Sequence, residues 1–526
     1  TMSHTETAAT PERFNFARHL IALNAGRPDK TALIDDAGVL TYGQLAEQVQ
    51  RCSAALTGLG LRREDRVLLL MHDCSDWVVS FLGALHAGVV PVCVNTLLTA
   101  KDYAYMLADS RAQAALVSGP LLPTLQTAMD GTPHEVRHLI VSRGQDLPAG
   151  AHDWAQWVAA AAPGTGADTH GDEPAFWLYS SGSTGAPKGT VHTQANLYWT
   201  AELYGKGVLG LRESDVVFSA AKLFFAYGLG NALSFPLSVG ASVVLMAERP
   251  TPQACFKRMT AHRPTVFCGA PTGYGGMLAA PDLPAQSAVA LRLCSSAGEA
   301  LPRDIGERWT AHFGCEIIDG IGSTEMLHIF LSNRPGDVRY GSTGKPVPGY
   351  EVQLRDEDGS VITGHNLIGD LYIQGPSAAL MYWNNRAKSR DTFQGPWAKS
   401  GDKYTRDPDG YYTYAGRNDD MLKVSGIYVS PFEVEATLVQ HTAVLEAAVI
   451  GKTDDDGLTK TKAYVVLKSG AQATEAELQA FVKEKLAPYK YPRFIEFVAE
   501  LPKTATGKIQ RFKLRELETQ RQFVRR

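Results

Sequence analysis

The chain has 526 residues, which is too many for one hydrophobic core and predicts two or more domains. Its net charge of −4 provides no bulk attraction to nucleic acid or to an anionic membrane, so neither is an expected partner. No apolar signal segment opens the chain, and its seven cysteines lie scattered in apolar stretches without metal-ligand spacing. We therefore expect a cytoplasmic protein with reduced thiols.

The first part of the chain alternates between helix and strand patterns. Thr41 and Gln44 form a capping-box pattern that predicts the start of a helix. Apolar runs at 67–71 and 89–94 predict strands, with a helix between them. The alternation returns beyond residue 240 and indicates an α/β fold with layered, parallel sheets. Glycines and Pro236 interrupt the most apolar stretch, so we expect no membrane span there.

A small α/β pattern starts again after Gly416. Apolar runs at 447–450, 463–467 and 494–498 predict strands, and Thr474 with Glu477 forms a second capping box. About a hundred residues can hold a modest core of their own. We therefore expect a large N-terminal domain of several subdomains over residues 1–418 and a small C-terminal α/β domain over residues 419–526.

The most informative segment is Ser-Ser-Gly-Ser-Thr-Gly-Ala-Pro-Lys-Gly at 180–189, directly after an apolar strand pattern. Its glycines let backbone N–H groups turn toward one point, its hydroxyls add donors, and Lys188 adds a positive charge. A loop with many donors and no acidic residue is typical of a polyphosphate site. Pro187 excludes the common P-loop pattern. A flexible Ser/Gly linker is the alternative, which Pro-Lys-Gly directly after a strand disfavours.

Several other motifs accompany this loop. A glycine turn within 502–511 presents Lys508. Thr324 and Glu325 place a hydroxyl beside a carboxylate, a pair that suits Mg²⁺ shared with phosphate oxygens. Asp402 is a lone carboxylate after a turn and could accept from two ribose hydroxyls. Each motif alone fits an ordinary loop, but their occurrence together, with the polar turn at 416–426, is very improbable by chance.

With these motifs, from Leu-Thr-Tyr at 40–42 to Arg511, the chain resembles the adenylate-forming enzymes: acyl-CoA ligases, luciferases and peptide-synthetase adenylation domains. It is most similar to bacterial benzoate–CoA ligases, through Lys-Leu-Phe-Phe-Ala-Tyr-Gly-Leu-Gly-Asn at 222–231 and through 319–325 followed by His328. The resemblance implies an ATP-dependent ligase of aromatic compound degradation that uses Mg²⁺. Benzoate or a close aromatic acid attacks ATP to give an acyl-adenylate and pyrophosphate, and coenzyme A then displaces AMP.

The resemblance also assigns the nucleotide site and the catalytic residues. The implied ATP-binding residues are Ser181, Gly182, Ser183, Thr184, Gly185, Lys188, Gly298, Glu299, Asp319, Gly320, Ile321, Asp402 and Arg417. The implied catalytic residues are Lys508, Lys423, Thr324 and Glu325, of which Glu325 is also the magnesium ligand. The family commonly has an aromatic ring where Ile321 stands, so this chain keeps an apolar wall for adenine but loses stacking.

The same resemblance implies a movement between the two half-reactions. The C-terminal domain would rotate about Asp419, removing Lys508 after adenylation and bringing in Lys423. Gly426 has no side chain and would line a narrow tunnel for the pantetheine arm of coenzyme A. Since the Lys508 ammonium must become exposed in the second conformation, Lys508 is also a predicted target of a lysine acetyltransferase and deacetylase.

The expected acid pocket combines aromatic walls with small Ala and Gly floors, which suit a flat ring. Its residues are Phe224, Ala226, Tyr227, Gly228, Gly269, Ala270, Ile321, Gly322, His328 and Ile329. No Asp or Glu stands among them to pair with an amine, which disfavours an amino acid substrate. Two interpretations of His328 stay open: a neutral core histidine, and a residue in direct contact with the acid.

Alternatives remain at three levels. The acid could be 4-hydroxybenzoate or 2-aminobenzoate instead of benzoate. The enzyme could be a stand-alone aryl acid adenylation enzyme that loads a carrier protein, although no carrier segment adjoins it. A non-catalytic nucleotide-binding regulator is the rival from another class, and intact Lys508, Glu325 and Lys188 disfavour it. Assembly as a homodimer also remains open.

Overall fold

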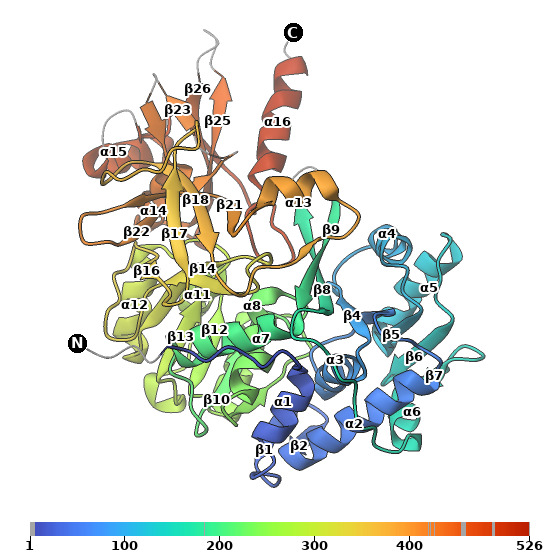
Figure 1. Cartoon of the computed structure of the whole chain (residues 1–526). Helices are drawn as coiled ribbons and strands as arrows, with labels where there is room; N and C mark the ends of the chain where they lie inside the picture. Colours follow the sequence, from blue (N-terminus) through green and yellow to red (C-terminus); the bar gives the residue numbers. More distant parts are fainter. Residues whose placement is uncertain are drawn as a thin grey trace.

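The computed structural model describes residues 6–182, 185–418, 420, 422–424, 427–453, 459–486 and 490–524. Figure 1 shows a large N-terminal region, coloured from blue to the orange of α13, with a small orange-to-red unit at one end. An eight-stranded sheet with the order β19-β9-β8-β4-β3-β5-β6-β7 forms one layer of the large region. Its strands are β3 (Arg66–Leu70), β4 (Val90–Cys93), β5 (Ala114–Ser118), β6 (His138–Ser142), β7 (His152–Asp153), β8 (Pro174–Gly182), β9 (Gly185–Thr193) and β19 (Met381–Tyr382).

Helices flank the parallel part of this sheet, so its central strands are buried on both faces and appear in the sequence as continuous apolar runs. These helices are α2 (Tyr42–Gly58), α3 (Ser75–Ala87), α4 (Ala100–Ser110), α5 (Leu122–Asp130) and α6 (Trp154–Ala160). The predicted capping box is present at the start of α2, where Thr41 and Gln44 exchange hydrogen bonds. The predicted strand–helix–strand order over residues 67–94 is confirmed.

A nine-stranded sheet with the order β16-β15-β14-β13-β12-β10-β11-β1-β2 forms the second layer. Its strands are β1 (Thr31–Asp35), β2 (Gly38–Thr41), β10 (Val216–Ser219), β11 (Ser242–Val244), β12 (Val266–Gly269), β13 (Leu293–Ser296), β14 (Ile317–Gly322), β15 (Ile329–Ser332) and β16 (Lys345–Pro346). The strands from β14 to β1 run parallel, and antiparallel strands close both edges. One buried core, which includes Trp77, Phe176 and Leu229, joins the two sheets.

The other helices of the two-sheet region are α1 (Phe16–Leu23), α7 (Gln194–Thr200), α8 (Ala226–Leu229), α9 (Phe235–Leu237), α10 (Pro252–Ala261), α11 (Pro271–Ala279) and α12 (Arg303–Phe313). A third, antiparallel sheet follows along the chain. It contains β17 (Glu351–Arg355), β18 (Gly369–Gln374), β20 (Phe393–Gln394), β21 (Trp397–Arg406) and β22 (Tyr412–Arg417), with α13 (Arg386–Thr392) before β20. In the part of the chain that the structure describes, no helix is long and apolar enough to cross a bilayer.

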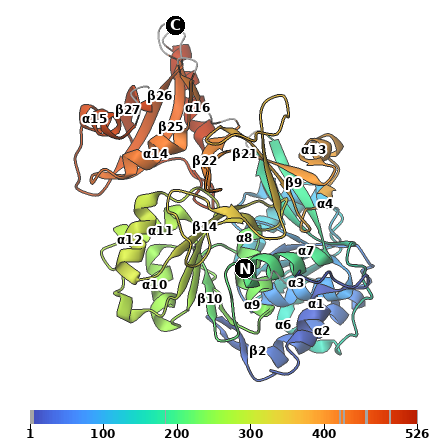
Figure 2. The ribbon, with the colours of Figure 1, turned by 60° about the vertical axis from the view of Figure 1, so that its left-hand side comes forward.

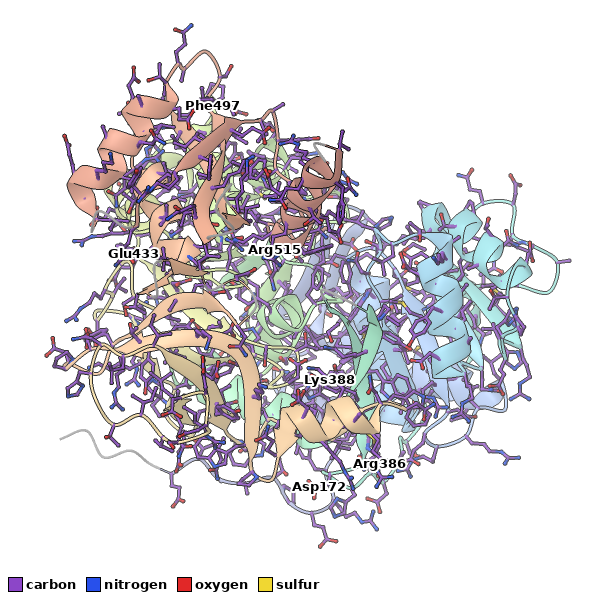
Figure 3. All side chains as sticks on the ribbon, turned by 90° about the horizontal axis from the view of Figure 1, so that it is seen from above. Asp172, Arg386, Lys388, Glu433, Phe497 and Arg515 are labelled. Atoms are coloured by element: carbon purple, nitrogen blue, oxygen red, sulfur yellow. The ribbon has the colours of Figure 1, made fainter. Side chains whose placement is uncertain are left out.

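The C-terminal unit has its own core, formed by Val434, Leu438, Val449, Val465 and neighbouring apolar residues. Its elements are β23 (Leu422–Val424), β24 (Ile427–Val429), α14 (Pro431–Val439), β25 (Val444–Thr453), β26 (Thr459–Leu467), α15 (Glu475–Lys485), β27 (Phe494–Phe497) and α16 (Arg511–Val524). Figure 2 shows this unit standing above α11 and α12. Figure 3 places Glu433, Phe497 and Arg515 on it, apart from Arg386 and Lys388 of α13.

The predicted fold class, a large layered α/β region with a small C-terminal α/β unit, is confirmed. The second capping box, at Thr474 and Glu477, is also present. The expected hinge Asp419 lies outside the described residues. The glycine-rich segment differs from the expected loop, because β8 continues to Gly182 and β9 begins at Gly185. Antiparallel pairing of Ser180 with Lys188 extends a hairpin through most of the motif.

Candidate functional site

Three parallel strands of the second sheet end beside one another and carry much of the predicted site. Gly269 at the end of β12 pairs with Ser296 of β13, and Ser296 pairs with Asp319 of β14. Ligands of α/β sheets bind at the carboxyl ends of such strands. This edge therefore brings together the predicted adenine residues and part of the predicted acid pocket, namely Gly298, Glu299, Asp319, Gly320, Ile321, Gly322, Gly269 and Ala270.

Two carboxyl groups lie at this edge. Asp319 is 4% exposed, and burial raises its pKa well above the usual range, although the Ser296 hydroxyl opposes the shift. The Asp319 Oδ1 atom has no hydrogen-bond partner among the described residues. Burial also raises the pKa of Glu299, against hydrogen bonds from Thr272 and the charges of Arg511 and Lys508. A buried carboxyl oxygen without a partner can accept from a ligand amino group, and a raised pKa weakens repulsion of a nearby anion.

The predicted phosphate and metal residues meet on the other sheet. Lys188 lies on β9 with its Nζ atom 5.0 Å from the ring centre of Tyr382. The Tyr382 hydroxyl donates to Glu325 Oε1 at 2.6 Å. Tyr382 belongs to β19, which pairs with β9, so one short edge strand joins Lys188 to Glu325. Sequence reasoning missed Tyr382 because nothing local marks a partner 57 positions away.

The tip of the glycine-rich hairpin is only partly described. Ser183 and Thr184 lie outside the described residues, and for Ser181, Gly182 and Gly185 only the backbone placement in β8 and β9 is known. Among the residues that the structure does describe, no three His, Cys, Asp or Glu side chains gather closely enough to hold a metal ion. Glu325 therefore stands as a single carboxylate in this part of the site.

The two predicted ribose residues are neighbours in the third sheet. Asp402 of β21 pairs with Arg417 of β22 in an antiparallel register. The Asp402 side chain is buried, and Gly401 beside it accepts a backbone hydrogen bond from Asn418 at 3.1 Å. The Arg417 side chain is not described, so only its backbone position beside Asp402 is established.

The predicted acid pocket surrounds the start of α8. Phe224 and Ala226 are buried, and the Tyr227 hydroxyl lies 3.1 Å from the Gly269 carbonyl oxygen and 3.0 Å from the Ser295 hydroxyl. Gly228 must lack a side chain, because a methyl group there would lie 2.0 Å from the Lys222 carbonyl oxygen. Ile321, Gly322 and Ile329 approach from the antiparallel pair β14 and β15. The structure thus gathers the pocket residues from three separate parts of the chain.

His328, which the sequence predicts for this pocket, is 3% exposed. Its Nε2 atom is 3.0 Å from the Tyr227 carbonyl oxygen, and its ring packs 4.4 Å from the Phe235 ring centre. Burial lowers the pKa of His328 to about 3. Since a carbonyl can only accept, Nε2 carries a proton, and the lowered pKa leaves the imidazole neutral near pH 7. This geometry favours the neutral histidine among the two interpretations.

Lys508 reaches the nucleotide edge from the C-terminal unit. A methyl group built on Gly298 would lie 3.6 Å from Lys508 Cε, and Thr272 Oγ1 of α11 lies 3.4 Å from the Gly507 carbonyl oxygen. Thr272 also donates from its backbone nitrogen to Glu299 at 2.8 Å, a contact that sequence reasoning did not identify. Lys508 thus lies beside the strand edge that carries the predicted adenine residues. The Lys423 side chain and Gly426 are outside the part of the chain that the structure describes.

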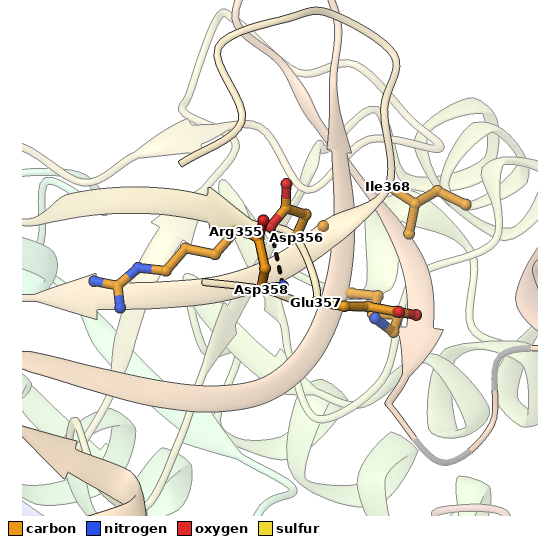
Figure 4. A pocket seen from close by; sticks show the side chains of 7 residues that line it. Arg355, Asp356, Glu357, Asp358 and Ile368 are labelled. Carbon is orange, nitrogen blue, oxygen red and sulfur yellow. Dashed lines mark hydrogen bonds between the residues drawn. The ribbon is translucent and has the colours of Figure 1, made fainter. Parts of the chain in front are cut away.

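The structure also contains a pocket of about 430 Å³ that other residues line (Figure 4). It is lined by Arg355, Asp356, Glu357, Asp358, Ile368, Gly369 and Lys403. Lys403 forms an ion pair with Asp370 at 3.1 Å, and Asp356 accepts a hydrogen bond from the Asp358 backbone at 3.2 Å. None of its lining residues is a predicted site residue, so we do not assign it to the site.

Comparison with known proteins gives concordant results. A family model described as AMP-binding enzyme matches residues 22–383, and one described as AMP-binding enzyme C-terminal domain matches residues 433–508. The chain is 59% identical over 512 residues to the benzoate–CoA ligase of Thauera aromatica, covering 96% of each chain.

Solved structures extend this likeness to the fold. The structure of a benzoate CoA ligase from Burkholderia xenovorans LB400 matches with a TM-score of 0.89 and 61% identity, covering 95% of this chain and 100% of that chain. The anthranilate CoA ligase AuaEII in complex with anthranoyl-AMP matches with a TM-score of 0.93 and 44% identity, covering 97% and 98%. The chain therefore belongs to the AMP-binding enzyme family.

Proposed function

We propose that the protein is an AMP-forming benzoate–CoA ligase, which converts benzoate, coenzyme A and ATP to benzoyl-CoA, AMP and pyrophosphate. The observation that supports this proposal is the cluster of apolar residues around Tyr227, in contact with the buried His328 and with the strand edge reached by Lys508. Likeness over nearly the whole chain to two benzoate–CoA ligases supports the same reaction. An apolar pocket favours the flat, uncharged ring of benzoate.

In the first half-reaction, a benzoate oxygen would attack the α-phosphorus of ATP. A bond forms from the carboxylate oxygen to phosphorus while the bond to the pyrophosphate oxygen breaks. We assign the residues at 181–185 and Lys188 to binding of the β- and γ-phosphates and Thr324 to binding of the α-phosphate. Lys508 would contact both the carboxylate oxygen of the acid and the α-phosphate, and so neutralise the negative charge between them. Positioned cations and N–H groups of this kind act on charge that moves in the transition state. Asp402 and Arg417 would hold the ribose.

A magnesium ion fits this donor set. Glu325 provides one carboxylate whose orientation the Tyr382 hydroxyl determines, and Mg²⁺ typically takes one or two protein carboxylates and keeps water and phosphate oxygens. When bound, the ion would neutralise the charge of the leaving pyrophosphate. Lys188 packs on the same Tyr382 ring, so one side chain contacts both the ammonium and the carboxylate.

In the second half-reaction, the thiol of coenzyme A would displace AMP from the acyl-adenylate. We propose that the C-terminal unit turns about the boundary near Asp419, so that residues 419–526 behave as one mobile domain against residues 1–418. Lys508 would leave and Lys423 with Gly426 would enter, opening a path for the pantetheine arm. The described backbone supports a boundary here, because β22 ends at Arg417 and β23 begins at Leu422.

The substrate range follows from the apolar walls. An apolar pocket separates compounds that differ by one methylene-sized group by only about 1–3 kcal/mol, so close analogues should react. The likeness to an anthranilate ligase keeps 2-aminobenzoate as the second candidate acid, followed by 4-hydroxybenzoate. Loading of a carrier protein would use the same adenylate and differs only in the thiol acceptor.

Two further proposals concern the cell. Seven buried cysteine thiols without a disulfide fit a reducing compartment, which supports a cytoplasmic enzyme. The exposed Lys508 side chain is suited to regulation by acetylation, which would remove the charge needed for adenylation. A homodimer stays a prediction.

Release of AMP and pyrophosphate, measured over a panel of acids with coenzyme A or a pantetheine-bearing carrier, tests the proposed function. The panel is benzoate, 2-aminobenzoate, 4-hydroxybenzoate, cyclohexanecarboxylate and hexanoate. We expect the highest kcat/KM for benzoate with free coenzyme A. A clear preference for hexanoate or 4-hydroxybenzoate would contradict the pocket assignment, a preference for the carrier would contradict the CoA ligase, and no pyrophosphate release with any acid would contradict an enzyme.

A further inference from the structure

A buried polar chain links strand β9 to the turn of residues 323–328, which joins β14 to β15. His192 Nε2 lies 2.7 Å from the carbonyl oxygen of Thr324, and His192 Nδ1 lies 2.8 Å from Asn196 Nδ2. Asn196 Nδ2 also lies 3.2 Å from the carbonyl oxygen of Ala378. His192 is 0% exposed and Asn196 is 3% exposed, so no bulk water competes for these bonds.

Carbonyl groups at both ends determine which atom donates. A carbonyl only accepts, so the amide group of Asn196 donates to Ala378, and the same NH₂ group donates to His192 Nδ1. His192 Nε2 must then carry the ring proton and donate to Thr324. Thr193 agrees with this orientation, because its hydroxyl accepts from Asn196 N at 3.2 Å and donates to Asn196 Oδ1 at 2.9 Å.

The surroundings keep the imidazole neutral and in one plane. Burial lowers the pKa of His192 to about 4, opposed by the bond to Thr324 and by the charge of Glu325. The ring stacks on Phe176 with 5.3 Å between ring centres and 16° between planes. A neutral ring with a fixed plane can donate only along one direction, toward the Thr324 carbonyl.

The turn is therefore held from β9 at two places. Residues 188 and 192 lie on the same face of the strand, because side chains alternate along it. Lys188 packs on Tyr382, which donates to the Glu325 side chain, while His192 donates to the Thr324 backbone. Ala379 follows Ala378, whose carbonyl oxygen accepts from Asn196, and it donates its own N–H to the Glu325 carbonyl oxygen at 2.8 Å. The backbone and the side chain of this turn are thus both connected to the strand of the glycine-rich hairpin.

We propose that His192 and Asn196 form a positioning dyad that aligns the Thr324 hydroxyl and the Glu325 carboxylate with the phosphate-binding strand. They are positioning residues, since they contact the Thr324 carbonyl and not the nucleotide. The inference rests on the proposed function, in which Thr324 and Glu325 act on the α-phosphate and on magnesium. Loss of the donated hydrogen bond should misplace both groups without removing either of them.

Two substitutions of His192 separate the hydrogen bond from the bulk of the ring. His192→Leu removes the donor. His192→Gln keeps a donor, because the side-chain amide nitrogen of glutamine is as many bonds from Cβ as the Nε2 atom of histidine. We expect His192→Leu to lower kcat for benzoate-dependent ATP–pyrophosphate exchange about 10–100-fold, the range seen when a partner of a metal ligand is lost. The Mg²⁺ concentration for half-maximal binding of a non-hydrolysable ATP analogue should rise in parallel. His192→Gln should stay within about threefold of wild type.

His86→Leu is the matched control for loss of a buried neutral histidine. His86 is 2% exposed and contacts the Ser53 hydroxyl at 2.8 Å, on α3 and α2. This control should lower the melting temperature but leave exchange kinetics unchanged below the transition. Asn196→Asp is the second test of the dyad, because a carboxylate cannot donate to His192 Nδ1 and instead stabilises the imidazolium. We expect a new ionisation in the pH profile of exchange and a changed ¹⁵N spectrum of the His192 ring.

The proposal would be overturned if His192→Leu and His192→Gln lost exchange equally, or if His192→Leu changed only the melting temperature, as His86→Leu should. An unchanged His192 spectrum in Asn196→Asp would also overturn it. Wild-type protein that released no pyrophosphate with any aromatic acid would contradict the proposed function instead. In that case, the Mg²⁺ dependence of analogue binding and the ¹⁵N spectrum would still decide the role of the dyad.

Discussion

The two sides of the candidate site are held in different ways. On the phosphate side, Tyr382 and His192 donate hydrogen bonds of 2.6 and 2.7 Å to Glu325 and to the Thr324 backbone. On the Lys508 side, Thr272 Oγ1 and the Gly507 carbonyl oxygen are 3.4 Å apart, and Lys508 packs over Gly298 without a side chain between them. Short hydrogen bonds to charged or carbonyl groups are the stronger contacts. The contacts on the phosphate side lie within the large region, whereas those on the Lys508 side join two units, so a movement of the C-terminal unit would separate only the second set.

The loop that carries Lys508 is firmly attached within its own unit. Arg511 at the start of α16 lies 2.6 Å from Glu435 Oε2 of α14, and Arg515 lies 2.7 Å from Asp420 beside the expected hinge. Glu435 also accepts from the backbone of Val449 at 2.8 Å. The ion pairs should therefore make the loop move together with the whole C-terminal unit, which is what alternation between two half-reactions needs.

Replacing Lys508 should have the largest effect on this comparison. Lys508→Ala should lower the adenylation rate about 10²–10³-fold, because one group that stabilises moving negative charge is lost. Formation of benzoyl-CoA from preformed benzoyl-adenylate should change little. Single-turnover rates of the two half-reactions measure the difference. Equal losses in both would show that Lys508 does not leave the site.

Acid should destabilise the large region through its buried, neutral histidines. His86, His192 and His328 are buried with pKa values lowered to about 4, 4 and 3. In the unfolded chain, imidazoles bind protons below about pH 6.5, so the unfolded state binds more protons than the folded state between about pH 6.5 and 4. As the pH falls through this window, each histidine should lower the free energy of unfolding, by roughly 3 kcal/mol for a pKa shifted by two units, while Asp319 and Glu299, whose pKa values are raised, oppose the loss. Urea titrations combined with hydrogen exchange would show which region loses stability. If the stability of the large region did not depend on pH, the prediction would be wrong.

Removing the Tyr382 hydroxyl should weaken the phosphate side of the site by removing one hydrogen bond to Glu325. Tyr382→Phe keeps the ring under Lys188 but loses the donor to Glu325, so adenylation should fall about tenfold and need more Mg²⁺. Rates measured over a Mg²⁺ titration test this expectation. The idea fails if the Mg²⁺ dependence of Tyr382→Phe matches that of wild type.

Replacing Thr272, which lies on the Lys508 side of the site, should have the smallest effect on adenylation. Thr272→Val removes the hydroxyl that donates to Glu299 at 2.5 Å and faces Gly507, so adenylation should fall roughly threefold as one neutral donor is lost. Thioester formation from the preformed adenylate should be unaffected. Thr272→Ser keeps the hydroxyl and is the control. Were both half-reactions slowed alike, Thr272 would be a structural residue without a part in docking the Lys508 loop.

Local patterns in the sequence determined much of the fold. Capping boxes at Thr41 and Thr474 and the continuous apolar runs of β3 and β4 depend on neighbouring residues and on burial of both strand faces, so they were predicted from the chain itself. The motifs and their order were likewise enough to show the resemblance to the family, and the resemblance implied the reaction. These features need no knowledge of which distant segments meet.

Only the tertiary structure decided how the site is assembled. The contact of Tyr382 with Glu325 joins residues 57 positions apart, and that of Thr272 with Gly507 joins residues 235 positions apart. The pairing of β19 with β9, which brings Tyr382 beside the strand of Lys188, is likewise a contact between distant segments. Such contacts depend on the order of strands in a sheet and on the docking of one unit against another. No local preference encodes them, since their free energy arises only after the distant partners are brought together.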